Sequence, residues 1–122
     1  MHWLNSLEQE RRDRVYGAMR TIRERSDQYD ANYRKLAPRA GELAVGAADW
    51  DEWHRSDILA TFLNKLYEGM EPDDAKDRAE FEAYRNVRAH NKQRPKDVNW
   101  QRWEESGFDV INWAWRLVNA AR

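Results

Sequence analysis

Apolar residues recur along this chain at helical spacings. Residues spaced alternately by four and three lie on one face of a helix. The longest such stripe contains Val15, Met19, Ile22, Ser26, Tyr29, Tyr33 and Leu36. Asn5 and Ser6 precede it with overlapping N-capping patterns, and Pro38 ends it. The sequence therefore predicts one long N-terminal helix. A second copy of the chain could cover its stripe, but we favour a core within one chain.

Two more patterns predict helices in the centre of the chain. The first follows Ser56 as an N-cap, ends at Gly69 as a C-cap, and repeats apolar residues at Ile58, Leu59, Phe62, Leu63, Leu66 and Tyr67. The second begins at Pro72, which suits the first helical position, and two aspartates after it complement the helix dipole. We expect this helix to run to about His90.

The remaining segments predict connections and a last helix. Residues 39–48 are rich in Gly and Ala and indicate a loop or a short, weak helix, and residues 91–99 indicate a basic loop. A last helix from about Phe108 is expected to bury Phe108, Ile111, Trp115 and Val118. Because period-2 alternation is absent, we predict an all-α, single-domain bundle over residues 1–122, with about four to five helices.

Composition narrows the class of protein further. The 122 residues include 41% hydrophobic and 35% charged residues and no cysteine. One moderate core is therefore expected, and disulfides, thiolate zinc sites and cysteine nucleophiles are excluded. Apolar stretches fall short of the roughly 20 residues that span a bilayer, and the N-terminus lacks a signal-peptide layout. We expect a soluble, cytoplasmic protein that does not enter membranes.

Charge is spread unevenly along the chain. Residues 1–39 carry nine basic and six acidic side chains, residues 40–84 four and twelve, and residues 85–122 eight and four. These blocks could steer an anionic partner toward the basic ends. We favour their pairing with one another inside the fold.

Two tryptophan pairs form an internal echo. Trp50 and Trp53 recur fifty residues on as Trp100 and Trp103, each pair at i, i+3 and so on one helical face. Packing of a short helix on the core is the favoured role for such rings. A base-stacking platform is the alternative in a nucleic-acid-binding protein, and aromatic anchors of an interface are the alternative in a protein-binding one.

The sharpest chemical pattern runs from Tyr84 to His90. Asn86 and His90 are i, i+4 neighbours, so the amide can orient the imidazole, whereas Arg85 lies roughly 140° around the helix from His90. An imidazole that moves the proton of a 2′-hydroxyl, beside a guanidinium that supports phosphoryl charge, suits RNA cleavage without metal or cofactor. Four cations would attract the RNA backbone: Arg88, Lys92, Arg94 and Lys96.

The Arg-Asn-x-x-x-His pattern of Arg85, Asn86 and His90 resembles the motif of HEPN domains. The resemblance implies a small helical domain that forms a homodimer, whose paired motifs cut RNA without metal, in a toxin or defence role. Only these three residues carry over. Arg88 departs from the apolar residue that many members have, and Asn91 and Lys92 replace a frequent aromatic. The competing hypothesis is a non-enzymatic helical adaptor or inhibitor, such as a phage or mobile-element protein, that binds a host protein or nucleic-acid complex.

Other polar residues have plainer interpretations. His54 lies among acidic residues, but converging metal ligands are lacking, so we expect no metal site. Ser56 and Ser106 are expected to cap helices rather than act as nucleophiles. His2 is expected to be inert at the chain terminus.

Overall fold

The computed structural model describes residues 2–36, 47–89 and 100–122, except for the side chains of residues 36, 47–51, 87–89 and 100–104. Its elements are a 3-10 helix η1 (Trp3–Ser6) and four α-helices, namely α1 (Gln9–Leu36), α2 (Ala47–Tyr67), α3 (Pro72–Ala89) and α4 (Trp100–Ala121). Within the described residues there is no strand, which confirms the all-α prediction and the long N-terminal helix.

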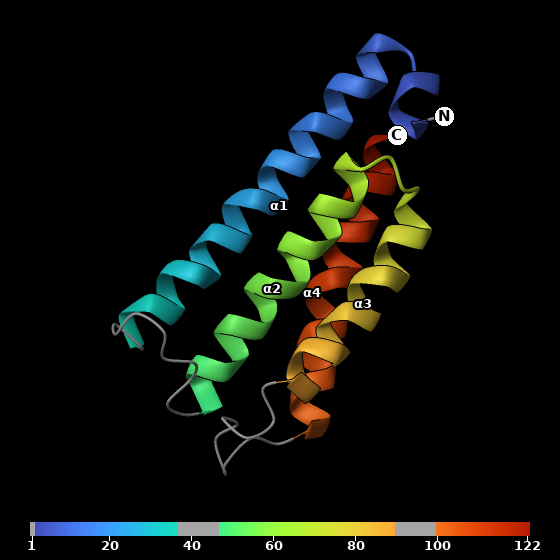
Figure 1. Cartoon of the computed structure of the whole chain (residues 1–122). Helices are drawn as coiled ribbons and strands as arrows, with labels where there is room; N and C mark the ends of the chain where they lie inside the picture. Colours follow the sequence, from blue (N-terminus) through green and yellow to red (C-terminus); the bar gives the residue numbers. More distant parts are fainter. Residues whose placement is uncertain (1, 37–46, 90–99) are drawn as a thin grey trace.

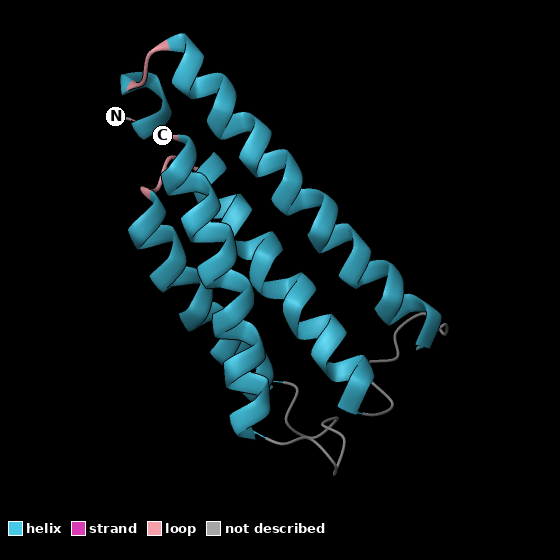
Figure 2. Ribbon diagram, turned by 180° about the vertical axis from the view of Figure 1, so that it is seen from behind, coloured by secondary structure: helices cyan, strands magenta, loops and turns pink. Residues whose placement is uncertain are grey.

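The four helices form a lengthwise bundle (Figure 1). α2 contacts each of the other three helices, and α4 contacts α1 and α3 as well. Both termini lie at one end, where the guanidinium of Arg122 is 5.8 Å from the Trp3 ring centroid. We call this the terminal half; the other, called the loop half, holds the C-terminal parts of α1 and α3 and the N-terminal parts of α2 and α4 (Figure 2).

The core confirms most of the predicted stripes. Along α1 the buried residues of the predicted stripe are Val15, Met19, Ile22 and Ser26, while Tyr29 and Tyr33 are half-buried. All the apolar residues predicted for α2 are buried except Tyr67, which is 49% exposed at the last position of the helix. The stripe of α1 therefore packs within one chain, as favoured above.

The buried face of α4 differs from the predicted one. It runs through Gly107, Val110, Ile111, Ala114 and Val118. Phe108 follows Gly107 by 100° of helical rotation and is 47% exposed, so its predicted burial is wrong. The predicted face was wrong because it was read from large apolar side chains, whereas the face that α4 buries includes a glycine and an alanine.

Three helix starts also differ from prediction. α1 begins at Gln9, because residues 3–6 form η1 and the Ser6 hydroxyl donates to the Trp3 carbonyl (2.7 Å) instead of capping. Ser56 and Ser106 lie inside α2 and α4, so they are not N-caps. Both tryptophan pairs lie in the first turns of these helices. The sequence pattern missed these turns because, beyond each pair, apolar residues do not continue through them at helical spacing.

The turn between α2 and α3 forms as predicted. Gly69 has φ +102° and donates to the Leu66 carbonyl (3.1 Å), while Met70 donates to the Lys65 carbonyl (3.0 Å). This pair of bonds is the Schellman C-cap, which favours glycine at the left-handed position. α3 then begins at Pro72, also as predicted.

His2 takes part in this turn through its ring nitrogens, and the expectation that it carries no chemistry stays a prediction. The His2 Nδ1 accepts from the Leu4 backbone N–H (3.3 Å), and Nε2 lies 3.2 Å from the Tyr67 carbonyl. A carbonyl only accepts, so in these two bonds Nε2 donates to the Tyr67 carbonyl while Nδ1 accepts. His2 thus ties η1 to the end of α2.

None of the described helices is long and apolar enough to cross a membrane.

Candidate functional site

The predicted motif lies in the last turns of α3. Arg85 is exposed, and its guanidinium carbon lies 5.9 Å from the Phe81 ring centroid. Asn86 is half-buried, and its Nδ2 donates to Oδ2 of Asp57 on α2 (2.9 Å). A hydrogen bond to a carboxylate is among the stronger ones, so this contact fixes the amide against α2. The bond uses one of the two Nδ2 hydrogens of Asn86 and does not involve its Oδ1, which is the acceptor of the amide.

The other residues of the predicted RNA site cannot be placed beside these two. His90, Lys92, Arg94 and Lys96 lie outside the described residues. Arg88 belongs to α3, but its side chain is outside them too. The meeting of Arg85 with His90 therefore stays a prediction, as does the homodimer.

The tryptophan pairs are placed by backbone only. Trp53 is half-buried on α2, which is consistent with packing. The side chains of Trp50, Trp100 and Trp103 lie outside the described residues. Their roles as core or interface stay open.

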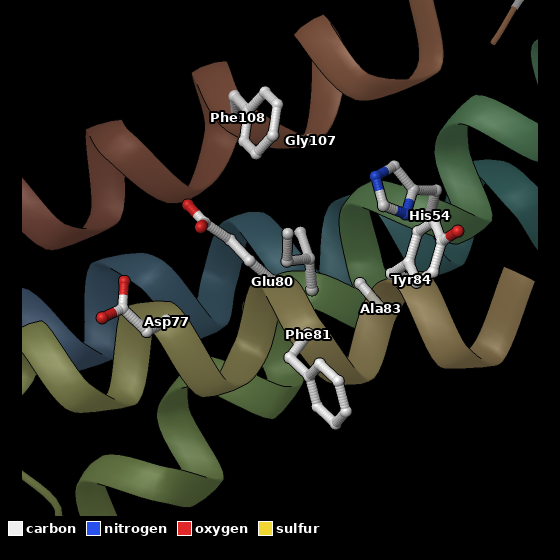
Figure 3. Close-up of a pocket in the computed structure, with 9 residues that line it drawn as sticks. His54, Asp77, Glu80, Phe81, Ala83, Tyr84, Gly107 and Phe108 are labelled. Carbon is white, nitrogen blue, oxygen red and sulfur yellow. The ribbon is translucent and has the colours of Figure 1, made fainter.

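A pocket of about 320 Å³ opens between α2, α3 and α4 in the loop half (Figure 3). Its lining includes Ile58 from α2, Ala83 and Tyr84 from α3, and Phe108 from α4. No local sequence pattern marks this pocket, because its walls come from residues more than fifty positions apart, from His54 to Phe108.

Exposed aromatic side chains gather around this pocket. Phe81 and Tyr84 are each 50% exposed and Phe108 is 47% exposed. They are three of the five large hydrophobic side chains that are exposed in the described part of the chain, the others being Tyr16 and Tyr67. Exposed aromatic side chains that line one pocket mark binding sites more often than singly scattered residues do.

His54 forms a polar part of the pocket wall. It is 2% exposed, and burial, assisted by the charge of neighbouring Arg55, lowers its pKa from 6.5 to about 3. The imidazole is therefore neutral near pH 7. Among the described residues, no group of three or more His, Asp or Glu side chains could hold a metal ion.

Gly107 allows α4 to approach His54. A Cβ added at position 107 would lie 3.2 Å from Cε1 of His54 and closer still to Nε2, inside ordinary contact distance. The only sequence signal for this contact is a glycine within an amphipathic helix, where it costs helix propensity and so suggests close packing. A glycine in this position could have indicated a close helix contact from the sequence, but it does not identify His54 as the residue that is contacted.

A polar network beside the pocket joins three helices. The Arg55 Nε donates to the Ser106 Oγ (2.6 Å), and its Nη1 lies 3.5 Å from Oε1 of Glu52. Asn32 on α1 donates to the other oxygen of Glu52 (3.2 Å). Ser106 therefore has a structural role between α2 and α4, and nothing in this network resembles an activated nucleophile.

Acidic and basic side chains occupy different places around the pocket. Asp77 and Glu80 of α3 line it. On the side of Phe81, the guanidinium carbons of Arg78 and Arg85 lie 5.3 and 5.9 Å from the ring centroid. A neutral imidazole, two carboxylates and several aromatic faces make a surface suited to binding.

No protein-family model, curated protein or solved structure matches the chain.

Proposed function

We propose that this protein is a non-enzymatic helical adaptor or inhibitor, which binds a partner protein through the face formed by α3 and α4. The gathering of Phe81, Tyr84 and Phe108 around one pocket supports this function most strongly. Aromatic anchors that meet a pocket carry most of the affinity in protein interfaces. Helices of a bundle hold such side chains rigidly, which lowers the ordering cost of association.

The pocket also has the size that one anchor of a partner requires. Its volume of about 320 Å³ accommodates a large side chain rather than a whole macromolecular segment. The rings of Tyr84 and Phe108 would then cover the surface around that anchor and exclude water from it.

Site-directed photo-crosslinking tests the binding face. A benzophenone amino acid replaces Tyr84 on the pocket face or Tyr16 on α1, which is also exposed (42%) and serves as the matched control. In the cells that produce the protein, we expect a discrete crosslinked partner from position 84 and none from position 16. Phe108→Ala should abolish the product. Equal crosslinking from both positions, or a product indifferent to Phe108→Ala, contradicts the proposal.

A second candidate function is the metal-independent HEPN-like ribonuclease. Two observations favour it: Arg85 is exposed, and Asn86, four residues before His90 in the sequence, is held by Asp57. In this function His90 transfers the 2′-hydroxyl proton and Arg85 stabilises the phosphoryl charge, in a site shared by two copies. Arg88, Lys92, Arg94 and Lys96 would bind the RNA backbone.

RNA degradation without added metal tests this second function. His90→Ala and Arg85→Ala should each lose activity, whereas Arg78→Ala, which removes another guanidinium beside Phe81, should keep it. Mixing the two inactive variants should restore part of the activity if one site draws on both copies. Equal degradation by all variants would exclude the ribonuclease, and growth inhibition relieved by the same substitutions would indicate a toxin.

A further inference from the structure

The pocket has an acidic wall on α3. In Figure 3 the Glu80 carboxylate points across the gap between α3 and α4 toward Phe108, and Asp77 lies one turn before it. Within the described part of the chain, Glu80 has one ion pair, from its Oε1 to Lys76 (3.0 Å). The carboxylate of Asp77 has no hydrogen bond or ion pair with another described residue. Negative charge at the rim is thus only partly compensated.

Apart from Lys76, the basic side chains near the pocket are directed to other contacts. Arg78 pairs with Glu82 (3.0 Å) and lies near the Phe81 ring, as Arg85 does. In Figure 3 the Phe81 ring extends from α3 on the side away from Phe108, so these guanidinium groups flank the outer side of α3. His54 is the basic residue of the wall itself, and its burial keeps it uncharged near pH 7.

The other walls suit an aliphatic stem and a cation. Ile58 and Ala83 are buried apolar side chains at the pocket. Tyr84 and Phe108 add aromatic faces, which attract cations through the ring quadrupole. An uncharged apolar anchor would remove water from Asp77 and Glu80 without replacing their lost hydration, and an acidic anchor would be repelled by them.

We infer that the pocket binds a basic side chain, lysine or arginine, of a partner protein. Its aliphatic stem packs against Ile58, Tyr84 and Phe108, and its charged end meets Asp77 and Glu80. Long basic side chains combine an apolar stem with a charged end, which matches this arrangement of walls. The inference rests on the proposed binding function and names the anchor that the partner supplies.

A titration with blocked amino acids tests the inference. The probe is N-acetyl-lysine N-methylamide, with the arginine derivative as a second probe and the norleucine derivative as the uncharged control of similar length. Amide resonances of Tyr84, Gly107 and Phe108 should shift saturably with either basic probe, at a Kd on the order of millimolar. The norleucine derivative should bind at least tenfold more weakly.

Two variants test whether the carboxylates of Glu80 and Asp77 bind the charged end of the probe. Glu80→Gln and Asp77→Asn should each weaken binding of the lysine probe severalfold, whereas Glu10→Gln, at an exposed carboxylate on α1, should not. Both substitutions lie on the helix surface, and circular dichroism confirms that the variants fold. Norleucine binding as tight as lysine binding, shifts that do not saturate, or affinity indifferent to both variants would overturn the inference.

Failure of this inference differs from failure of the binding function. If crosslinking from position 84 succeeds while the basic probes do not bind, the adaptor function stands and the basic anchor is wrong. If the probes bind but crosslinking gives no partner, the pocket chemistry stands and the adaptor function falls. In a crosslinked partner, replacing the lysine or arginine nearest to the crosslink by methionine should weaken association at least tenfold.

Discussion

The two halves of the bundle are held together by different chemistry. In the terminal half, large apolar side chains such as Met19, Leu63 and Val118 are fully buried. In the loop half, polar groups enter the interior or join helices, as Ser26, His54 and the Asn86–Asp57 pair do. The pocket and its exposed aromatic rim also lie there.

This difference indicates where stability and function reside. Apolar burial contributes about 25 cal/mol per Å² and requires only shape, whereas hydrogen bonds between polar groups contribute about 1 kcal/mol each and require direction. The terminal half therefore supplies stability, and the loop half fixes the relative positions of helices. A surface that leaves aromatic rings half exposed contributes little to folding, which is consistent with selection for binding.

Truncation of a large core side chain should cause the greatest loss of stability. Phe62 is 0% exposed, so Phe62→Ala should lower the free energy of unfolding by about 3–5 kcal/mol, through lost burial and the cavity left behind. Tyr84→Ala on the pocket rim should change it by less than about 0.5 kcal/mol. Urea denaturation measures both. Similar losses for the two variants would contradict the division between the halves.

Acidification should destabilise the loop half through His54. The unfolded chain takes up a proton as the pH falls through 6.5, but the folded chain does so only near the lowered pKa of about 3. The free energy of unfolding should therefore fall by about 2 kcal/mol between pH 7 and pH 5 because of this group. His54→Met should lack this component. Equal pH dependence in the variant and the unmodified protein would show that the imidazole is not buried uncharged.

Two helical glycines should respond in opposite ways to alanine. At Gly107 the added methyl meets the His54 ring, so Gly107→Ala should destabilise the fold by about 1–3 kcal/mol. It should also perturb the resonances of the pocket. A neutral or stabilising effect on unfolding in urea would mean that α4 lies farther from α2.

A smaller change of opposite sign is expected at Gly17 on the exposed side of α1. A Cβ there meets nothing within 4 Å, so Gly17→Ala should stabilise the helix by about 0.5–1 kcal/mol. A thermal-melting comparison with Gly107→Ala displays the opposite signs. Destabilisation at Gly17 would indicate that this face of α1 is covered.

Periodicity predicted the elements that large side chains define. The stripe from Val15 to Ile22 and the Gly69 cap could be read directly, because each depends on residues close in sequence. α3 packs through Ala75, Ala79 and Ala83, which are buried but too small to stand out in a hydrophobic pattern. The buried faces of short side chains therefore emerge only from tertiary packing.

The candidate site was predictable only in part. Arg85 and Asn86 could be proposed from a local motif, but the Asn86–Asp57 bond joins residues 29 positions apart. The fit of Gly107 against His54 likewise depends on how α2 and α4 meet. The same limitation explains the errors at Phe108, Ser56 and Ser106, whose surroundings are set by neighbouring helices.

Hydrogen exchange of the chain, with and without the partner identified by crosslinking, tests the binding face most directly. Binding through the pocket should protect amides of residues 77–86 on α3 and 105–110 on α4, and should leave residues 9–25 of α1 unchanged. Protection confined to α1, with α3 and α4 exchanging as in the free protein, would contradict the assignment of the pocket face as the functional surface.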